Sequence, residues 1–195
     1  MRITARAHEL VRAAVRPGET VIDATVGNGH DTLFLAQCVG SGGRVIGFDV
    51  QPEALARAGE RLLAAGVGEG LVTLHSRGHE AMGSHIDAPV GAVMFNLGYL
   101  PGGDHGMITC PGTTVAALQV AAGLLRDGGL LSIVCYPGHP GGQEEMLAVN
   151  KWAKGLPRRH FRMAWSPDEQ GRSAPRLLCV NKLGKTAQAP RTSRE

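Results

Sequence analysis

Aromatic residues and cysteines are scarce in this sequence, and long apolar runs are missing. Phe, Trp and Tyr make up 4% of the 195 residues, whereas 28 residues are glycine, so tight turns and close backbone approaches should be frequent. The four cysteines lie far apart without a CxxC pair. This spacing excludes a zinc ribbon and a disulfide framework, and it favours free thiols in a reducing compartment, the cytoplasm. No run approaches 18 apolar residues, so we expect no membrane span.

Charge of one sign is not in large excess either. The formal charge is +3, from 20 basic and 17 acidic residues, which permits a nucleic-acid partner without requiring one. The side chains that might suggest a metal do not recur at helical spacing with supporting carboxylates, so we expect no metal site. These side chains are His75, His79, His85, His105 and Cys110.

Apolar runs of strand length are interspersed with helical patterns through most of the chain. The first 19 residues have the pattern of an amphipathic helix and not of a signal peptide. Near-continuous apolar strands separated by helices predict a parallel sheet that is covered on both faces. The expected strands are 20–27, 43–50, 71–76, 90–98, 130–138, 160–167 and 175–183, and the expected further helices are 30–39, 52–66, 113–129 and 142–155.

The order of these elements predicts a doubly wound, Rossmann-like α/β fold. We expect a mostly parallel seven-stranded sheet that ends in an antiparallel hairpin, which is the arrangement of class I methyltransferases. One domain should span residues 1–183. Residues 184–195 lack apolar content and are expected to form a disordered tail.

The segment DATVGNGHD, from Asp23 to Asp31, joins the first strand to the helix that follows it. Gly27 and Gly29 allow a sharp turn and let a ligand approach the backbone N–H groups. Asp49 ends the second strand, 22 residues after Gly27. At that distance its carboxylate can accept hydrogen bonds from both hydroxyls of a ribose, so the segment predicts a site for a nucleotide-like cofactor.

Two cofactors use such a site. A dinucleotide normally requires a third glycine, where this sequence has Thr32, and Asp31 would repel a pyrophosphate. S-adenosylmethionine (SAM) carries no phosphate, and its ammonium group would favour a carboxylate such as that of Asp23. The pattern therefore favours SAM over NAD. The alternative is that the glycines only form a tight turn and that Asp31 caps the helix.

The segment MFNLGYLPGGDH, residues 94–105, places an amide and an aromatic ring after a buried strand. Asn96 should lie at the carboxyl edge of the sheet, where ligands bind in such folds. NLGY has the shape of the Asn/Asp-Pro-Pro-Tyr/Phe loop of amino-methyltransferases. The Asn96 side chain and the Leu97 backbone carbonyl would hold an amine so that its lone pair points at the methyl group. Tyr99 would stack on a flat base or close the pocket.

Three further features are candidates for substrate binding. Asp104 would contact the substrate ammonium or cap its own turn. In the loop YPGHPGG, Tyr136 and His139 would hold the target base, or His139 would accept the proton of the amine; alternatively, prolines only stiffen this turn. The run 151–162 holds five Lys/Arg and no acid, which suits RNA phosphates or a solvated face. Its candidate residues are Lys151, Arg158 and Arg159.

Three segments in order, DATVGNGHDTLFLA, FNLGYLPGGDH and YPGHPGGQEE, resemble the YtqB/MnmM-type family, which is labelled as rRNA methylases. The resemblance spans roughly residues 4–183, and the better-defined members are tRNA 5-aminomethyl-2-thiouridine methyltransferases. It implies SAM-dependent N-methylation of the 5-aminomethyl group of wobble uridine, giving 5-methylaminomethyl-2-thiouridine. It also implies the tRNA anticodon stem-loop as partner and a homodimer.

Matched by motif, the resemblance also implies site residues. His79 and Glu80 fall after the third strand, where the adenine should lie, with Gly78 in place of a serine. Alternatives are methylation of rRNA or another amine, a non-catalytic RNA-binding module and an NAD(P)-dependent oxidoreductase. The implied cofactor residues are Asn28, Gly29, His30, Asp31, Asp49 and Gln51, and the implied acceptor residues are Asn96, Leu97, Tyr99, Tyr136 and His139.

Overall fold

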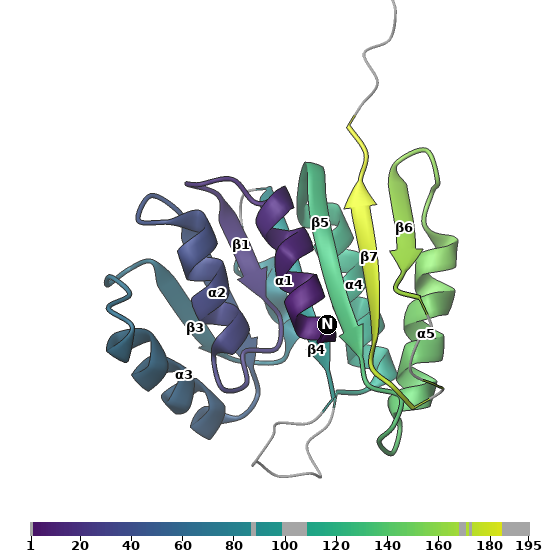
Figure 1. Ribbon diagram of the computed structural model, residues 1–195, viewed down its shortest axis with the longest axis horizontal. Coiled ribbons are helices and arrows are strands. Elements are labelled where there is room, and N and C mark those ends of the chain that lie inside the picture. The colour runs from purple at the N-terminus through teal and green to yellow at the C-terminus, as the bar shows by residue number, and fades with distance from the viewer. Residues whose placement is uncertain (1, 87–88, 99–108, 168–170, 172, 185–195) are drawn as a thin grey trace, which may run out of the picture.

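Seven strands form one mixed sheet in the order β3-β2-β1-β4-β5-β7-β6 (Figure 1). The computed structural model describes residues 2–86, 89–98, 109–167, 171 and 173–184. Strands β1 to β5 pair in parallel, whereas β7 is antiparallel to both β5 and β6. The strands are β1 Thr20–Asp23, β2 Arg44–Asp49, β3 Val72–Ser76, β4 Val90–Leu97, β5 Leu125–Cys135, β6 Phe161–Trp165 and β7 Arg176–Lys182. The predicted fold class is confirmed.

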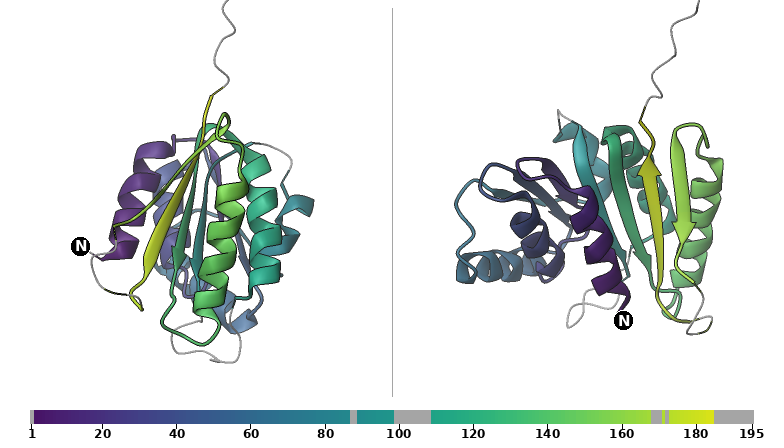
Figure 2. Two further views of the ribbon diagram at one scale, coloured as in Figure 1. Left: turned by 90° about the vertical axis from the view of Figure 1, so that its right-hand side faces the viewer. Right: turned by 45° about the horizontal axis from the view of Figure 1, so that its top comes forward.

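Helices cover both faces of the sheet, with α1, α2 and α3 on one side and α4 and α5 on the other (Figure 2). Successive strand residues point to opposite faces, so β4 contributes Phe95 to the core beneath α4 and Met94 to the core beneath α1 and α2. The helices are α1 Ile3–Ala14, α2 His30–Val39, α3 Pro52–Ala64, the short η1 His79–Ser84, α4 Pro111–Leu124 and α5 Gly142–Gly155. None of the helices in the described ranges is long and apolar enough to cross a membrane.

The N-terminal helix is amphipathic, as the sequence predicts. Ala7 and Val11 are buried, and Ile3, Leu10 and Ala14 pack at the edge of the same core cluster. Helices α2 and α5 also have the predicted bounds. These matches follow from the spacing of apolar residues, which places one side of each helix against the sheet.

The predicted helix over 113–129 is wrong at both ends. The helix α4 begins at Pro111, a residue favoured in the first helical turn, and ends at Leu124. Leu125 adopts an extended backbone with ψ 135° and pairs with Val90 of β4. The segment that the sequence pattern assigned to the helix terminus therefore begins β5.

The predicted first strand is too long. Strand β1 ends at Asp23, and the next six residues form the turn into α2. Gly27 and Gly29 have φ of 50° and 77°, a region that favours glycine. A Cβ atom on Gly29 would lie 2.7 Å from the Cβ of Ala58 on α3. The second glycine therefore also permits close packing of α3 against this turn.

Candidate functional site

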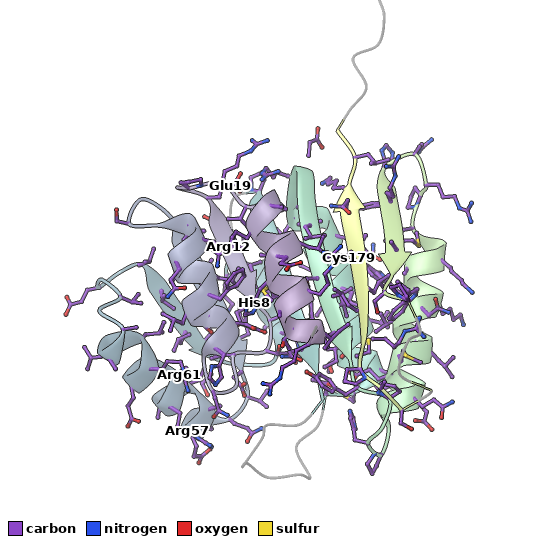
Figure 3. All side chains as sticks on the ribbon, in the orientation of Figure 1. His8, Arg12, Glu19, Arg57, Arg61 and Cys179 are labelled. Carbon is purple, nitrogen blue, oxygen red and sulfur yellow. The ribbon has the colours of Figure 1, made fainter. Side chains whose placement is uncertain are left out.

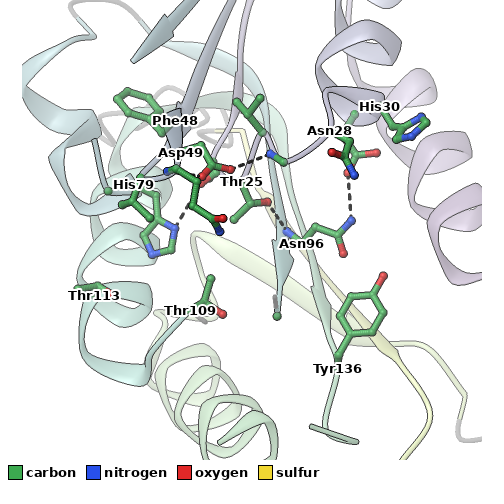
Figure 4. Close-up of a pocket in the computed structure, with 18 of the residues that line it drawn as sticks. Thr25, Asn28, His30, Phe48, Asp49, His79, Asn96, Thr109, Thr113 and Tyr136 are labelled. Carbon is green, nitrogen blue, oxygen red and sulfur yellow. Dashed lines mark hydrogen bonds between the residues drawn. The ribbon is translucent and has the colours of Figure 1, made fainter. Parts of the chain in front are cut away.

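A cavity of about 910 Å³ opens at the carboxyl edge of the parallel strands (Figure 4). This volume suits a small-molecule ligand together with part of a second one. The loops after β1, β2, β4 and β5 and the start of η1 contribute its walls. Eleven lining residues are among those predicted from the sequence: Gly27, Asn28, His30, Asp31, Asp49, Gln51, His79, Glu80, Asn96, Tyr136 and His139.

The carboxylate of Asp49, at the end of β2, is held in one orientation by two hydrogen bonds. Its Oδ2 atom accepts a hydrogen bond from the Gly27 N–H at 2.8 Å, and its Oδ1 atom accepts one from the Gln51 N–H at 2.9 Å. Each carboxylate oxygen keeps further acceptor capacity. This geometry fits the predicted hydrogen bonds to the two hydroxyls of a ribose.

His79 begins η1 and forms a buried wall of the cavity, with 7% of its surface exposed. Its Nδ1 atom lies 3.3 Å from the Ala24 carbonyl oxygen, so Nδ1 must carry the hydrogen and Nε2 is an acceptor. Burial lowers the pKa of this imidazole and keeps it neutral. Nε2 is buried without a partner among the described residues, as expected for a contact to a polar heterocycle such as adenine.

Asn96 and Asp31 approach each other from β4 and from the first turn of α2. The Asn96 N–H donates to the Thr25 hydroxyl at 2.8 Å, and its Nδ2 atom donates to Asp31 Oδ2 at 3.4 Å. An ionised carboxylate only accepts hydrogen bonds, so the NH₂ end of the amide must face Asp31. The Oδ1 atom of Asn96 is buried and unpaired in the part of the chain that the structure describes. It is therefore available to a ligand.

Tyr136 lies directly after β5 and beside Asn96 in the cavity (Figure 4). Burial and the nearby Asp31 carboxylate raise the pKa of its phenol, against a hydrogen bond with Asn96 that lowers it. A Cβ atom on Gly98 would contact Tyr136 and His139 at 3.6 and 3.7 Å. The two loops predicted to bind the acceptor therefore meet on one side of the cavity.

The predicted role of Asp23 requires correction. Asp23 is fully buried and is not among the lining residues of the cavity. It accepts hydrogen bonds from the Thr25 N–H at 3.1 Å and the Thr32 hydroxyl at 2.6 Å. Burial, and secondarily the Asp31 charge, raises the pKa of Asp23 to about 7. Asp23 thus holds the turn from within, whereas Asp31, eight residues later, borders the cavity together with Asp49.

Two other predicted residues do not line the cavity, and two cannot be placed. Gly29 packs against Ala58, and the Leu97 side chain is fully buried in the core. A role for the Leu97 backbone carbonyl stays a prediction. Tyr99 and Asp104 lie outside the described residues.

The predicted basic run does not line the cavity, and its role in binding RNA phosphates stays a prediction. Helix α5 begins next to the cavity and extends 14 residues away from it, which is about 21 Å. Phe161, the first residue of β6, pairs with Lys182 of β7. The preceding residue of β7, Asn181, pairs with Leu130 of β5. The start of β6 therefore lies toward the amino end of β5. The segment between α5 and β6, which contains Arg158 and Arg159, is therefore at the opposite edge of the sheet (Figure 1). Lys151 is exposed on the outer surface of α5 and does not line the cavity.

The sequence interpretation missed His8, which reaches the cavity from α1. Its Nε2 atom lies 2.7 Å from Asp31 Oδ1. One signal was present: His8 precedes Val11 by three residues, so it falls on the buried side of an amphipathic helix. Other lining residues without a sequence signal include Thr25, Phe48, Arg77 and Thr109.

The strand order, together with an acidic residue ending β2 and a glycine turn after β1, defines the class I SAM-dependent methyltransferase architecture. Solved structures share it. The crystal structure of a "putative rRNA-methylase" from Clostridium thermocellum has a TM-score of 0.90 and 42% identity, covering 94% of this chain and 98% of that chain. SMU.1697c from Streptococcus mutans, described as "a putative methyltransferase" and solved in complex with SAH, has a TM-score of 0.84 and 33% identity, covering 94% of this chain and 99% of that chain.

The family profile described as "Putative rRNA methylase" matches residues 45–181, and the chain belongs to this family. It is also similar to the chloroplastic tRNA (mnm(5)s(2)U34)-methyltransferase of Arabidopsis thaliana, with 42% identity over 166 residues. The tRNA 5-carboxymethoxyuridine methyltransferase of Escherichia coli is 27% identical over 166 residues. These alignments cover 80% and 84% of this chain. They span 60% and 58% of the length of the two relatives.

Proposed function

We propose that this protein transfers a methyl group from SAM to the 5-aminomethyl nitrogen of wobble uridine or 2-thiouridine in tRNA. The observation that carries the proposal is the Asn96 amide oxygen, buried and unpaired within the described residues, at the end of β4. It lies in one cavity with Asp49 and His79 on the cofactor side and Tyr136 on the other. An amine needs such an acceptor, because its N–H bonds must be held for its lone pair to face the methyl donor.

The residues of the cofactor side fit SAM. Asp49 would hold the ribose hydroxyls, and the neutral His79 would contact the adenine. Asp31 provides a carboxylate for a cationic group, and such a charge would oppose a pyrophosphate. When bound, SAM supplies an electrophilic methyl group on its sulfonium sulfur. The same residues therefore argue against the NAD(P)-dependent alternative.

The residues of the acceptor side fit a protonatable amine attached to a flat base. The Asn96 oxygen accepts one N–H, and the Tyr136 ring borders the space beside it. A primary amine is mostly protonated at neutral pH and must lose a proton before it attacks. His139 is the candidate acceptor; its Nδ1 atom lies 2.8 Å from the Pro140 carbonyl oxygen, which leaves Nε2 as the basic nitrogen.

The activity of the Arabidopsis relative, a tRNA (mnm(5)s(2)U34)-methyltransferase, supports the wobble-uridine substrate, whereas the family description supports rRNA as the second candidate. The anticodon stem-loop as partner, a homodimer and a cytoplasmic location are inferred from the family resemblance and stay predictions. The purified protein should methylate tRNA that carries 5-aminomethyl-2-thiouridine, detected as 5-methylaminomethyl-2-thiouridine by nucleoside mass spectrometry. Methyl transfer to rRNA, with none to this tRNA, would overturn the assignment in favour of the second candidate.

The Asn96→Ala variant tests the residue that carries the proposal. We expect loss of methyl transfer by at least about 100-fold, since one preorganised polar contact in a transition state contributes that much. SAM affinity measured by calorimetry should change less than about threefold, because the amide faces the acceptor side. Unchanged turnover would remove Asn96 from the mechanism.

A further inference from the structure

A histidine of the N-terminal helix, His8, lines the cavity and has no assigned role in the proposed reaction. The His8 ring stacks on the Phe34 ring of α2, with centroids 3.8 Å apart and planes 1° from parallel. The Arg12 guanidinium lies 5.0 Å from the centroid of the same Phe34 ring. Figure 3 shows His8 and Arg12 on α1, in front of the sheet. The Phe34 ring, itself in contact with the Arg12 cation, therefore stacks on this imidazole and limits its movement.

His8 continues into the acceptor site through Asp31. Its Nε2 atom is 2.7 Å from Asp31 Oδ1, and the side chains of His8 and Asp31 are 29% and 12% exposed. The other Asp31 oxygen, Oδ2, accepts the hydrogen bond from Asn96 Nδ2. Three side chains from α1, α2 and β4 thus form one chain of hydrogen bonds. Its far end is the Asn96 carbonyl oxygen, unpaired among the described residues.

We propose that His8 is a positioning residue, which fixes the Asp31 carboxylate and thereby sets the orientation of the Asn96 amide. This inference rests on the proposed function. An amide presents an acceptor at one end and two donors at the other. Only the orientation with NH₂ toward Asp31 presents an oxygen to the N–H bonds of an amine. Without the hydrogen bond from His8, the carboxylate keeps its contact with Asn96 Nδ2 through Oδ2 but loses the bond that fixes Oδ1. The anchor that keeps the donor end of the amide out of the acceptor space is then less firmly held.

Two substitutions separate the hydrogen bond of His8 from its packing. His8→Gln keeps an N–H donor close to the position of Nε2, whereas His8→Phe keeps the aromatic stack on Phe34 and removes the donor. We expect kcat for the aminomethyl tRNA to fall about tenfold in H8F, because misplacement of a reacting group lowers the chemical step. It should stay within about threefold of the unsubstituted protein in H8Q. The KM values for SAM and tRNA should change less than about twofold in both.

A measurement without substrate turnover reports on the same chain of hydrogen bonds. The side-chain NH₂ signals of Asn96 can be recorded by ¹H–¹⁵N NMR and assigned by their loss in an Asn96→Asp variant. We expect these hydrogens to exchange with water faster in H8F than in the unsubstituted protein, and at the native rate in H8Q. Thermal unfolding of each variant distinguishes loss of positioning from loss of folding.

Several results would overturn the inference. They are a kcat in H8F equal to that of the unsubstituted protein, equal losses of kcat in H8F and H8Q, or an unchanged exchange rate of the Asn96 NH₂ hydrogens in H8F. A large fall in melting temperature in both variants would assign His8 to stability and overturn the inference as well. If the unsubstituted protein does not methylate the aminomethyl tRNA, the proposed function fails, and the NMR comparison still decides the role of His8.

Discussion

At the scale of single residues, the site is built from acceptors whose orientation is set by backbone donors. Asp49 is held by two N–H groups, and Asp23 is held by one N–H group and one hydroxyl. The two carboxylates differ in what surrounds them. Asp49 borders the cavity, whereas Asp23 is fully enclosed. Asp49 is therefore placed where it can contact a ligand, whereas Asp23 supports the turn from inside the fold.

Replacing Asp49 by Asn should weaken SAM binding by about 10- to 100-fold. The amide would present NH₂ to one of the two backbone donors that now face carboxylate oxygens, and hydrogen bonds to a charged group contribute about 1.5–3 kcal/mol. Isothermal titration calorimetry with SAM measures the effect. Glu53→Gln, an exposed change in the first turn of α3, is the matched control and should bind SAM normally. Native affinity in D49N would exclude the ribose contact.

Asp23 should make the folded state less stable as the pH rises from about 4 to about 7. Its folded pKa is raised from 3.8 to about 7, so across this window the folded chain binds more protons than the unfolded chain. In Asp23→Asn the amide can accept from Thr25 and donate to Thr32 without titrating. Urea unfolding at several pH values should therefore show a smaller decrease in stability for D23N than for the unsubstituted protein. Exposed Glu60→Gln should leave the slope unchanged, and equal slopes in D23N would contradict the assigned pKa.

At the scale of elements, helix α5 is tied to the segment that returns from the acceptor loop. Glu145 of α5 is 1% exposed. Its two carboxylate oxygens accept hydrogen bonds from the Thr109 and Thr114 hydroxyls, both at 2.7 Å. Thr109 lines the cavity, and its N–H donates to the Gly98 carbonyl. The position of α5 is thereby coupled to the acceptor side of the site.

Replacing Glu145 by Leu should destabilise the protein by about 2–4 kcal/mol, because the buried Thr114 hydroxyl and the half-buried Thr109 hydroxyl lose their acceptor. The same change should lower kcat more than SAM affinity, since Thr109 belongs to the acceptor side. Glu144→Leu, an exposed neighbour on α5, is the control for added apolar surface. Equal effects of the two substitutions on unfolding and on kcat would show that the buried carboxylate has no special role.

The sequence predicted elements well where one periodic pattern dominates. Helices α2 and α5 have their predicted bounds, because apolar spacing and flanking glycines mark both ends. The sequence prediction was wrong where a tertiary contact determines the secondary structure. Leu125 has the same apolar character as the helix before it, yet pairing with Val90 assigns it to a strand. The turn η1 was missed, because its six residues are too few for a periodic signal.

At the scale of the whole molecule, the site residues that could be predicted are those whose positions are set by the sheet topology. Asp49 and Asn96 end parallel strands, so topology alone brings them to one edge. His8 reaches the same cavity only because α1 packs over β4 and β5, a placement that no local pattern specifies. Asp23 was misjudged for a similar reason. Asp23 ends β1 just as Asp49 ends β2. Helix α2 covers Asp23, however, and Thr32 of that helix donates a hydrogen bond to its carboxylate.

The position of the basic run leads to a prediction for RNA binding by the whole molecule. Arg77 is exposed at the cavity, whereas Arg158 and Arg159 lie at the opposite edge of the sheet. A bound wobble nucleotide brings the neighbouring phosphates of its loop close to the cavity. Arg77→Gln should therefore weaken binding of an anticodon stem-loop about 3- to 10-fold and reduce the salt slope by about 1.

The double variant R158Q/R159Q, which removes twice the charge, should bind the same stem-loop within about twofold of the unsubstituted protein. Fluorescence anisotropy with a labelled stem-loop over a range of salt concentrations measures both quantities. A larger loss in the double variant than in R77Q would mean that the RNA extends around the molecule to the far edge. That result would contradict the prediction that basic residues near the cavity contribute more to RNA binding than those at the opposite edge. Because the double variant removes more charge than R77Q, a smaller loss of binding in the double variant must come from position and not from the amount of charge removed.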